Sequence, residues 1–133
     1  MRAKGGNDEV SGGAGNDRLF GDRGNDTLNG DAGKDQIKGG SGGDLLNGGK
    51  GADVLSGGSG ADTFFFKRGD GKDRITDFNI GQDLIEIGKG ANKLGKLNFN
   101  KQGSDVLVTF ANVEILVEDV TLRMLRDADN FEF

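Results

Sequence analysis

The chain of 133 residues contains no cysteine and no histidine. Their absence excludes disulfide bonds and thiolate metal sites, and it removes the usual ligands of zinc and most pairs of a nucleophile with a base. No stretch approaches the roughly 20 apolar residues of a membrane span. Met1 to Lys4 lead directly into a glycine-rich repeat, without the apolar segment of a secretory signal peptide. We therefore expect any export to use another route.

Apolar residues are also scarce, because the chain has 33% hydrophobic residues, 26 glycines and no proline. A conventional globular domain of this composition would struggle to offset its chain entropy. The formal net charge of −5 and the pI near 4.7 disfavour nucleic acid as a partner, since phosphates are bound by clustered Lys and Arg. Hard, oxygen-preferring cations are the better candidates, and something besides apolar burial must hold the chain together.

What the chain does contain is a nine-residue repeat that runs from Ala3 to Phe65 in seven copies. Position six of every copy is an aspartate, with a glycine two residues before it and an apolar residue two residues after it. The aspartates are Asp8, Asp17, Asp26, Asp35, Asp44, Asp53 and Asp62, and the apolar residues are Val10, Leu19, Leu28, Ile37, Leu46, Leu55 and Phe64. A short period held by several residue classes at once is the signature of a solenoid.

The unit reads G-G-x-G-x-D-x-(apolar)-x, most clearly in residues 12–20, 39–47, 48–56 and 57–65. Its glycine-rich half predicts a turn, because Gly, Asp and Asn tolerate positive φ. Its last three residues predict a short strand with the apolar side chain inward. Two units then complete one coil of a right-handed parallel β-roll, in which the strands of alternate copies lie about 4.8 Å apart.

Stacking of the coils would bring the aspartates into columns, where neighbouring carboxylates repel by about 1 kcal/mol even at the dielectric constant of water. Calcium would reverse the sign, since it takes about 6–8 oxygen ligands and accepts carboxylates and backbone carbonyls. Magnesium fits less well, because it demands a tighter octahedron and keeps its waters. The alternative for a glycine-rich acidic stretch is a flexible linker, but a linker has no reason to hold an apolar residue two positions after every aspartate.

The unit resembles the calcium-binding nonapeptide of the repeats-in-toxin (RTX) family, a parallel β-roll near the C-termini of secreted bacterial proteases, lipases, epimerases, adhesins and cytolysins. The resemblance implies about five calcium ions, each held between adjacent coils by two position-six aspartates and by backbone carbonyls. It pairs Asp8 with Asp26, Asp26 with Asp44, Asp44 with Asp62, Asp17 with Asp35, and Asp35 with Asp53. The implied carbonyl ligands belong to Gly6, Gly13, Gly15, Gly24, Gly33, Gly40, Gly42, Gly49, Gly51, Gly58 and Gly60.

This chain departs from the family pattern at a few positions. Ala3 and Lys4 replace the opening glycines of the first unit, and Asp22 and Asp31 occupy position two, where only the backbone is expected to bind an ion. After the seventh copy, residues 69–76 repeat the order G-x-G-x-D-x-(apolar) following a two-residue insertion. We interpret them as a degenerate eighth turn, in which Asp73 would close a sixth site with Asp53.

Residues 66–133 leave the nine-residue frame, and we expect them to form a β-rich cap on a roll of residues 3–65. Strands are predicted at Ile75–Phe78, Leu84–Ile87, Leu97–Phe99, Val106–Phe110, Val113–Val117 and Asn130–Phe133, with a hairpin turn at Ala111–Asn112. The only helix expected is a short one over Thr121–Asp127, with Thr121 or Asp119 as its N-cap. The predicted fold class is therefore all-β.

The order G-D-G-x-D-x-I-x-D-F and the closing segment Asp129–Phe133 are similar to the C-terminal cap of the same family. That resemblance implies an uncleaved signal for the type I secretion machinery, while a hydrophobic plug for the roll is the simpler role, and the two are compatible. We find no serine beside a base, and we interpret Glu114 and Glu118 as charges on a strand surface rather than as a catalytic pair.

The sequence thus predicts a non-catalytic, monomeric calcium-binding module that folds outside the cell and supports secretion of its bacterial parent protein. Two alternatives are an adhesin or receptor-binding segment of a toxin, and the tail of a secreted protease, lipase or epimerase.

Overall fold

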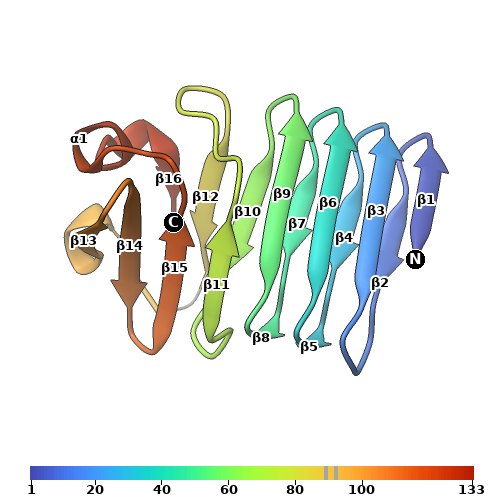
Figure 1. Cartoon of the computed structure of the whole chain (residues 1–133), viewed down its shortest axis with the longest axis horizontal. Coiled ribbons are helices and arrows are strands. Elements are labelled where there is room, and N and C mark those ends of the chain that lie inside the picture. The colour runs from blue at the N-terminus through green and yellow to red at the C-terminus, as the bar shows by residue number, and fades with distance from the viewer. Residues whose placement is uncertain (89, 92) are drawn as a thin grey trace.

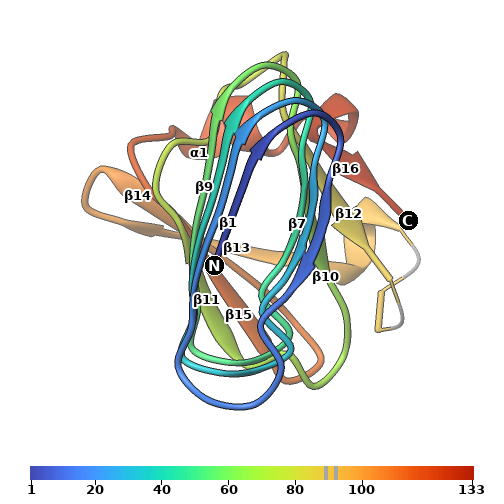
Figure 2. The same cartoon turned by 90° about the vertical axis from the view of Figure 1, so that its right-hand side faces the viewer.

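The chain winds into a stack of coils with a parallel β-sheet on each side, as the computed structural model of residues 1–88, 90–91 and 93–133 shows (Figure 1). Viewed along the stack, the two sheets face each other across a narrow interior (Figure 2). One sheet contains β1 (Arg2–Gly5), β3 (Arg18–Arg23), β6 (Gln36–Ser41), β9 (Val54–Ser59) and β11 (Lys72–Ile75). The other contains β2 (Glu9–Ser11), β4 (Thr27–Asn29), β7 (Leu45–Asn47), β10 (Thr63–Phe66) and β12 (Leu84–Ile87). The predicted parallel β-solenoid is confirmed.

The register of the strands follows directly from the nine-residue unit. Leu28 lies opposite Leu46, which lies opposite Phe64, so the apolar residues of alternate copies are neighbours in adjacent coils. The other sheet aligns Leu19, Ile37 and Leu55 in the same way. All six side chains are buried, whereas Val10 in the first copy is only partly buried. Each unit therefore contributes one side chain to a thin apolar core between the sheets.

The turns between the strands depend on glycine for two separate reasons. Gly42 has φ 130, and a Cβ there would collide with the carbonyl of Gly24 in the preceding coil. Backbone conformation and lack of space thus both require glycine at position four. Position two also has positive φ but accepts other residues, because Asp22 and Asp31 each have φ 73. Two short strands, β5 (Ala32–Gly33) and β8 (Lys50–Gly51), pair along one row of turns.

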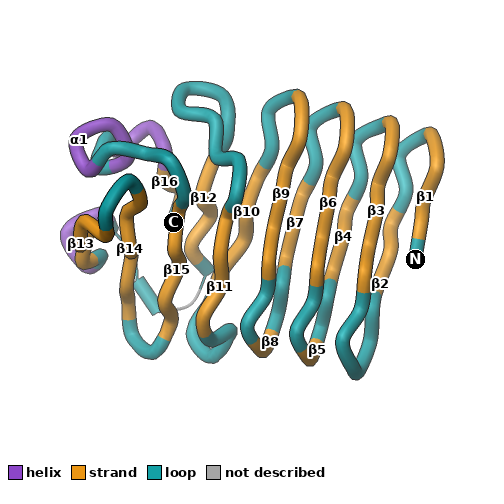
Figure 3. Tube along the Cα trace, in the orientation of Figure 1, coloured by secondary structure: helices purple, strands orange, loops and turns teal. Residues whose placement is uncertain are grey.

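The C-terminal part of the chain extends both sheets of the roll. β15 (Val113–Val117) pairs in parallel with β11. β14 (Asp105–Phe110) then pairs antiparallel with β15, and β13 (Asn98–Gln102) pairs antiparallel with β14. β16 (Phe131–Glu132) adds to β12 on the opposite side. One short helix, α1 (Leu122–Leu125), and two 3₁₀ turns (Leu94–Lys96 and Ala128–Asn130) complete this end (Figure 3). Both sheets of the last coil are therefore covered.

Several predicted boundaries were wrong. β11 covers Lys72–Ile75, so the strand predicted at Ile75–Phe78 is confirmed only at its first residue; Asp77 instead uses its carboxylate to accept hydrogen bonds from the Gly57 and Gly58 N–H groups, 2.9 and 3.0 Å long. The predicted strand Leu97–Phe99 begins at Asn98 and continues to Gln102, since that segment pairs with β14.

The end of the chain also differs in detail from the prediction. The helix is only Leu122–Leu125, and its N-cap is Thr121, whose hydroxyl accepts a hydrogen bond from the Met124 N–H. The last strand is confined to Phe131–Glu132, because Asn130 belongs to a 3₁₀ turn and donates to the Met124 carbonyl. The hairpin turn at Ala111–Asn112 and the strand Val113–Val117 are confirmed. No helix among the described residues is long and apolar enough to cross a membrane.

Candidate metal centre

The position-six aspartates stack directly on one another at the starts of the strands. The backbone N–H of Asp26 donates a 2.8 Å hydrogen bond to Asp44 Oδ1, and the N–H of Asp44 donates a 2.9 Å bond to Asp62 Oδ1. Equivalent bonds of 2.8–3.0 Å link Asp8 to Asp26, Asp17 to Asp35, Asp35 to Asp53, and Asp53 to Asp73. The structure therefore brings the predicted aspartates together in the two predicted columns, and Asp73 joins the second.

The other carboxylate oxygen of these aspartates has no partner. Within the described chain, Oδ2 is buried and accepts no hydrogen bond in all members of the two columns: Asp8, Asp17, Asp26, Asp35, Asp44, Asp53, Asp62 and Asp73. From Asp26 onward these residues are at most 4% exposed. An unsatisfied buried polar atom costs about 1–3 kcal/mol, and more when it is charged. A repeated cost of this kind is expected where a ligand supplies the missing interaction.

Glycine at position one leaves space beside each of these oxygens. A Cβ built on Gly30 would lie 2.5 Å from Asp35 Oδ2 and 2.5 Å from the carbonyl oxygen of Gly48 in the next coil. The bare Cα thus keeps a carboxylate oxygen and a carbonyl oxygen close together. At positions two and four, the carbonyl oxygen of one coil likewise lies close to the glycine at the same position in the next coil. Gly40 O lies beside Gly58, and Gly24 O lies beside Gly42.

This set of oxygens fits a calcium ion. No group of three or more acidic side chains among the described residues is placed to hold a metal. Each interval between coils offers two column carboxylates, so the remaining ligands must be backbone carbonyls or water. Calcium accepts all of these oxygens and tolerates irregular geometry.

Burial affects the charge of the columns. It raises the pKa of Asp62 to about 6 and that of Asp73 to about 8, because desolvation disfavours the charged carboxylate and neighbouring aspartates add repulsion. The pKa values of Asp44 and Asp53 are raised for the same reasons. In the ion-free fold these carboxylates therefore hold protons more readily than free aspartates do, and a cation must compete with those protons.

Other acids in the turns have protein partners instead. Asp31 Oδ2 accepts hydrogen bonds from the Ser11 hydroxyl and from the Gly13 N–H, and Asp77 Oδ2 accepts a 2.7 Å bond from the Ser56 hydroxyl. Asp22 pairs with Arg2 at 3.5 Å. These carboxylates connect successive coils without an ion, which distinguishes them from the columns.

Sequence reasoning missed two features of this stack. Asparagine side chains at position five accept hydrogen bonds from the next coil, as Asn7 Oδ1 does from the Asn25 N–H at 2.9 Å and Asn25 Oδ1 from the Gly43 N–H at 2.9 Å. The signal was the asparagine at position five of the first three copies. The second is Asp83, whose Oδ1 accepts a 3.0 Å hydrogen bond from the Asp62 N–H.

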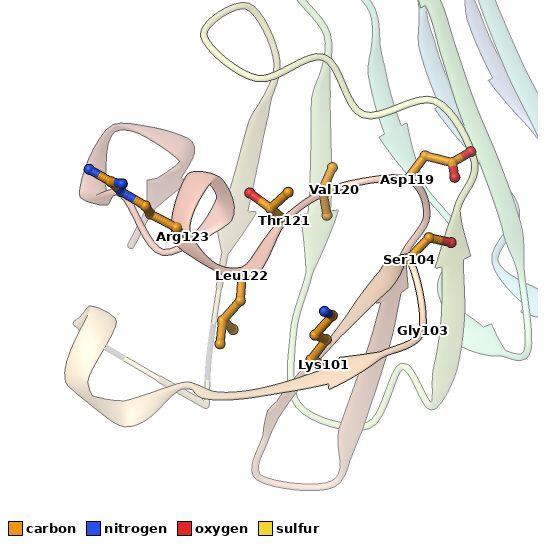
Figure 4. Close-up of a pocket in the computed structure, with 8 residues that line it drawn as sticks. All are labelled: Lys101, Gly103, Ser104, Asp119, Val120, Thr121, Leu122 and Arg123. Atoms are coloured by element: carbon orange, nitrogen blue, oxygen red, sulfur yellow. The ribbon is translucent and has the colours of Figure 1, made fainter.

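A cavity in the cap is lined by Lys101, Ser104, Asp119 and Arg123, among others. Figure 4 shows Asp119 and Arg123 on opposite sides of it, with their charged groups pointing apart. The Ser104 hydroxyl donates to Asp105 at the rim. Glu114 and Glu118 form surface ion pairs with Lys72 and Arg74, as their interpretation as surface charges requires.

The fold and the stacked oxygens together define a class of protein, a parallel β-solenoid whose turns bury two columns of carboxylates. A family model of the RTX calcium-binding nonapeptide repeat matches residues 2–37 and 38–73, which is more than half of the chain. The chain belongs to this family. No curated protein matches it in sequence.

Parts of two enzymes of known structure are similar to this chain. The extracellular lipase LipA from Serratia marcescens matches 96% of this chain with a TM-score of 0.55 and 22% identity. The AlgE6R2 subunit of the Azotobacter vinelandii mannuronan C5-epimerase matches 94% with a TM-score of 0.50 and 25% identity, and AlgE6R3 of the same enzyme matches 96% with a TM-score of 0.49 and 31% identity. The chain covers 20% of the lipase, 91% of AlgE6R2 and 78% of AlgE6R3.

Proposed function

We propose that this chain is a calcium-dependent folding module in which ions bind between successive coils, beside the position-six aspartates. The observation that carries the proposal is the pair of columns of buried Oδ2 atoms without hydrogen-bond partners. Membership of a calcium-binding repeat family agrees with it. Each interval between two stacked aspartates holds one ion, which gives about six ions from Asp8 to Asp62 and from Asp17 to Asp73.

The ligands in each interval are the two carboxylates and the carbonyls of the surrounding turns. The family resemblance implies carbonyls at positions two and four of one turn and at positions one and three of the next, and Gly48 O, a position-one carbonyl, lies beside Gly30 together with Asp35 Oδ2. An ion there satisfies the unpartnered oxygens and cancels the repulsion between stacked carboxylates. Binding free energy then becomes folding free energy, which offsets the thin apolar core.

The division of the chain into a roll of residues 3–65 and a cap of residues 66–133 stays part of this proposal. A chain that folds only when calcium binds would be unfolded at low cytosolic calcium and could thread a secretion channel before it folds outside. A role in type I secretion of a bacterial parent protein is supported by the family and by the similarity to an extracellular lipase fold. The closing segment Asp127–Phe133 would carry the signal.

Calcium binding is tested by counting ions with native mass spectrometry after dialysis against millimolar calcium and a tenfold excess of magnesium. We expect about six bound calcium ions, and their loss on chelation. A protein that stays free of metal, or that takes up magnesium equally well, would refute the proposal. Secretion is tested separately, by fusing residues 66–133 to a reporter in a bacterium with a type I system and comparing it with a reporter that lacks residues 127–133.

A further inference from the structure

The aspartate column continues beyond the nonapeptide repeat. β12 stacks on β10 with Thr63 opposite Leu84 and Phe64 opposite Ile85, just as Thr27 lies opposite Leu45 inside the roll. Asp83 precedes Leu84 and so occupies position six of this coil. Its Oδ1 accepts a 3.0 Å hydrogen bond from the Asp62 N–H, although 21 residues separate the two, whereas the bond from Asp44 to Asp62 spans 18.

The interval between Asp62 and Asp83 has the same unsatisfied oxygen as the intervals in the roll. Asp62 is 1% exposed and its Oδ2 accepts no hydrogen bond within the described chain. This atom lies against the bare Cα of Gly57, as the Oδ2 atoms of Asp44 and Asp53 lie against Gly39 and Gly48. Asp83 is also buried, at 4% exposure.

The partner turn is different from the turns of the roll, since it is built from residues 77–82 instead of a glycine-rich half-unit. It keeps Gly81 two residues before Asp83, with φ 81. Asp83 Oδ2 accepts a 2.8 Å hydrogen bond from the Asn79 N–H, which orients the carboxylate. A carboxylate offers about four lone-pair sites, so two accepted hydrogen bonds leave Asp83 able to bind a cation.

We propose that Asp62, which the family model includes, and Asp83, which lies beyond the matched residues, hold a further calcium ion at the junction of the roll and the cap. This inference rests on the proposed function, because it extends the same ion chemistry by one interval and raises the expected count from about six to about seven ions. The ion connects the turn before β10 with the turn before β12, and β12 pairs with β16 of the cap. Docking of the cap thereby becomes calcium-dependent.

The test is a count of bound calcium in three proteins by native mass spectrometry at saturating calcium, with circular dichroism to show that each is folded. Asp83→Asn keeps the side-chain size and the acceptor for the Asp62 N–H but removes the charge. We expect it to bind about one ion fewer than the unaltered chain. Asp70→Asn is the matched control, because Asp70 is also buried, at 1% exposure, but its carboxylate is held by Lys67. It should keep the full count.

A second variant makes the result independent of how well Asp83→Asn folds. Asp62 borders the intervals to Asp44 and to Asp83, so Asp62→Asn should lose about two ions, whereas it would lose about one if no ion bound at Asp83. An unchanged count in Asp83→Asn, or a loss of one ion in Asp62→Asn, overturns the inference and leaves the proposed function intact. An unaltered chain that binds no calcium overturns both.

Discussion

The roll and the cap are built on the same two sheets but are stabilised differently. In the roll, each unit after the first buries one apolar side chain, and the aspartate of every unit has a buried Oδ2 without a partner. In the cap, β14 and β15 bury a continuous hydrocarbon core that includes Val106, Val108 and Ile115. An aspartate there is satisfied by protein groups, since Asp105 accepts hydrogen bonds from the Asp119 N–H and from Ser104. The part of the cap around β14 therefore satisfies its carboxylate with protein groups, whereas the roll and the adjoining Asp73 carry buried carboxylate oxygens without partners.

The difference explains why the two regions belong together. An open solenoid end exposes its core and its unpaired strand edges. Here β15 covers the edge of β11 and β16 covers that of β12, while the Phe78 ring packs on Phe64 with centroids 6.0 Å apart. The cap supplies the apolar burial that the roll lacks, and in our proposal calcium compensates the charge of the aspartate columns, including the two members that lie in the cap, Asp73 and Asp83.

Removal of the cap should have the largest effect. Burial of a large apolar side chain contributes about 1.5–3 kcal/mol, and a chain that ends at Phe65 would expose Phe64 together with both sheet edges. We expect this chain to stay disordered, or to need far more calcium, in a titration followed by circular dichroism. Partial recovery on fusion of an unrelated soluble β-cap would show that coverage is what matters. Folding at the calcium midpoint of the whole chain would show that the roll needs no cap.

Loss of one column aspartate should have the next largest effect, and its size should depend on position. Asp44 borders two intervals, toward Asp26 and toward Asp62, whereas Asp8 borders one at the open end. Asp44→Ala should therefore raise the calcium midpoint and reduce the number of bound ions more than Asp8→Ala does. Isothermal titration calorimetry measures both quantities. Equal effects of the two substitutions would contradict the pairing of alternate copies.

Close packing of the turns predicts a smaller effect, which again differs between two positions. Gly42→Ala would push a methyl group into the Gly24 carbonyl, while Gly13→Ala has positive φ but no atom within 4 Å of the added Cβ. The second change should cost only the strain of a left-handed residue, about 1–2 kcal/mol, and the first should cost clearly more. Urea unfolding at saturating calcium compares the two. Equal losses would mean that space between coils does not limit the turn.

The smallest expected effect is that of pH. The pKa values of about 6 for Asp62 and about 8 for Asp73 lie above the value of about 3.9 for an unfolded chain. Stability gained by these protons in the ion-free fold is fully present below about pH 4 and is lost as the pH rises through 6 and 8. Calcium competes with the same protons, so its midpoint for folding should be lower at pH 8 than at pH 6. The chelated chain should retain more β-structure at pH 5 than at pH 8. A midpoint that does not change with pH would show that the columns stay ionised without calcium.

The repeat made most of the roll predictable, because a period of nine residues places Asp44 and Leu46 in the same register in every coil. Asp83 was missed as a member of the column, since the three extra residues between it and Asp62 break the period even though G-x-D-x-I is retained at 81–85. Pairing of β15 with β11 was not predictable either, because the two strands are far apart in the sequence and no local pattern specifies their contact. Strand ends such as Ile75 were set by a side chain of the following turn, Asp77, which propensity does not capture.

We propose that the roll folds because calcium satisfies its buried carboxylates. The most direct test is a far-ultraviolet circular dichroism titration of the whole chain with calcium, in the presence of excess magnesium and after chelation of bound metal. We predict a largely disordered chain without calcium and a cooperative change to a β-spectrum at about 10⁻⁴–10⁻³ M calcium, the usual range of extracellular sites. A β-spectrum that persists unchanged in chelator at neutral pH would contradict the account.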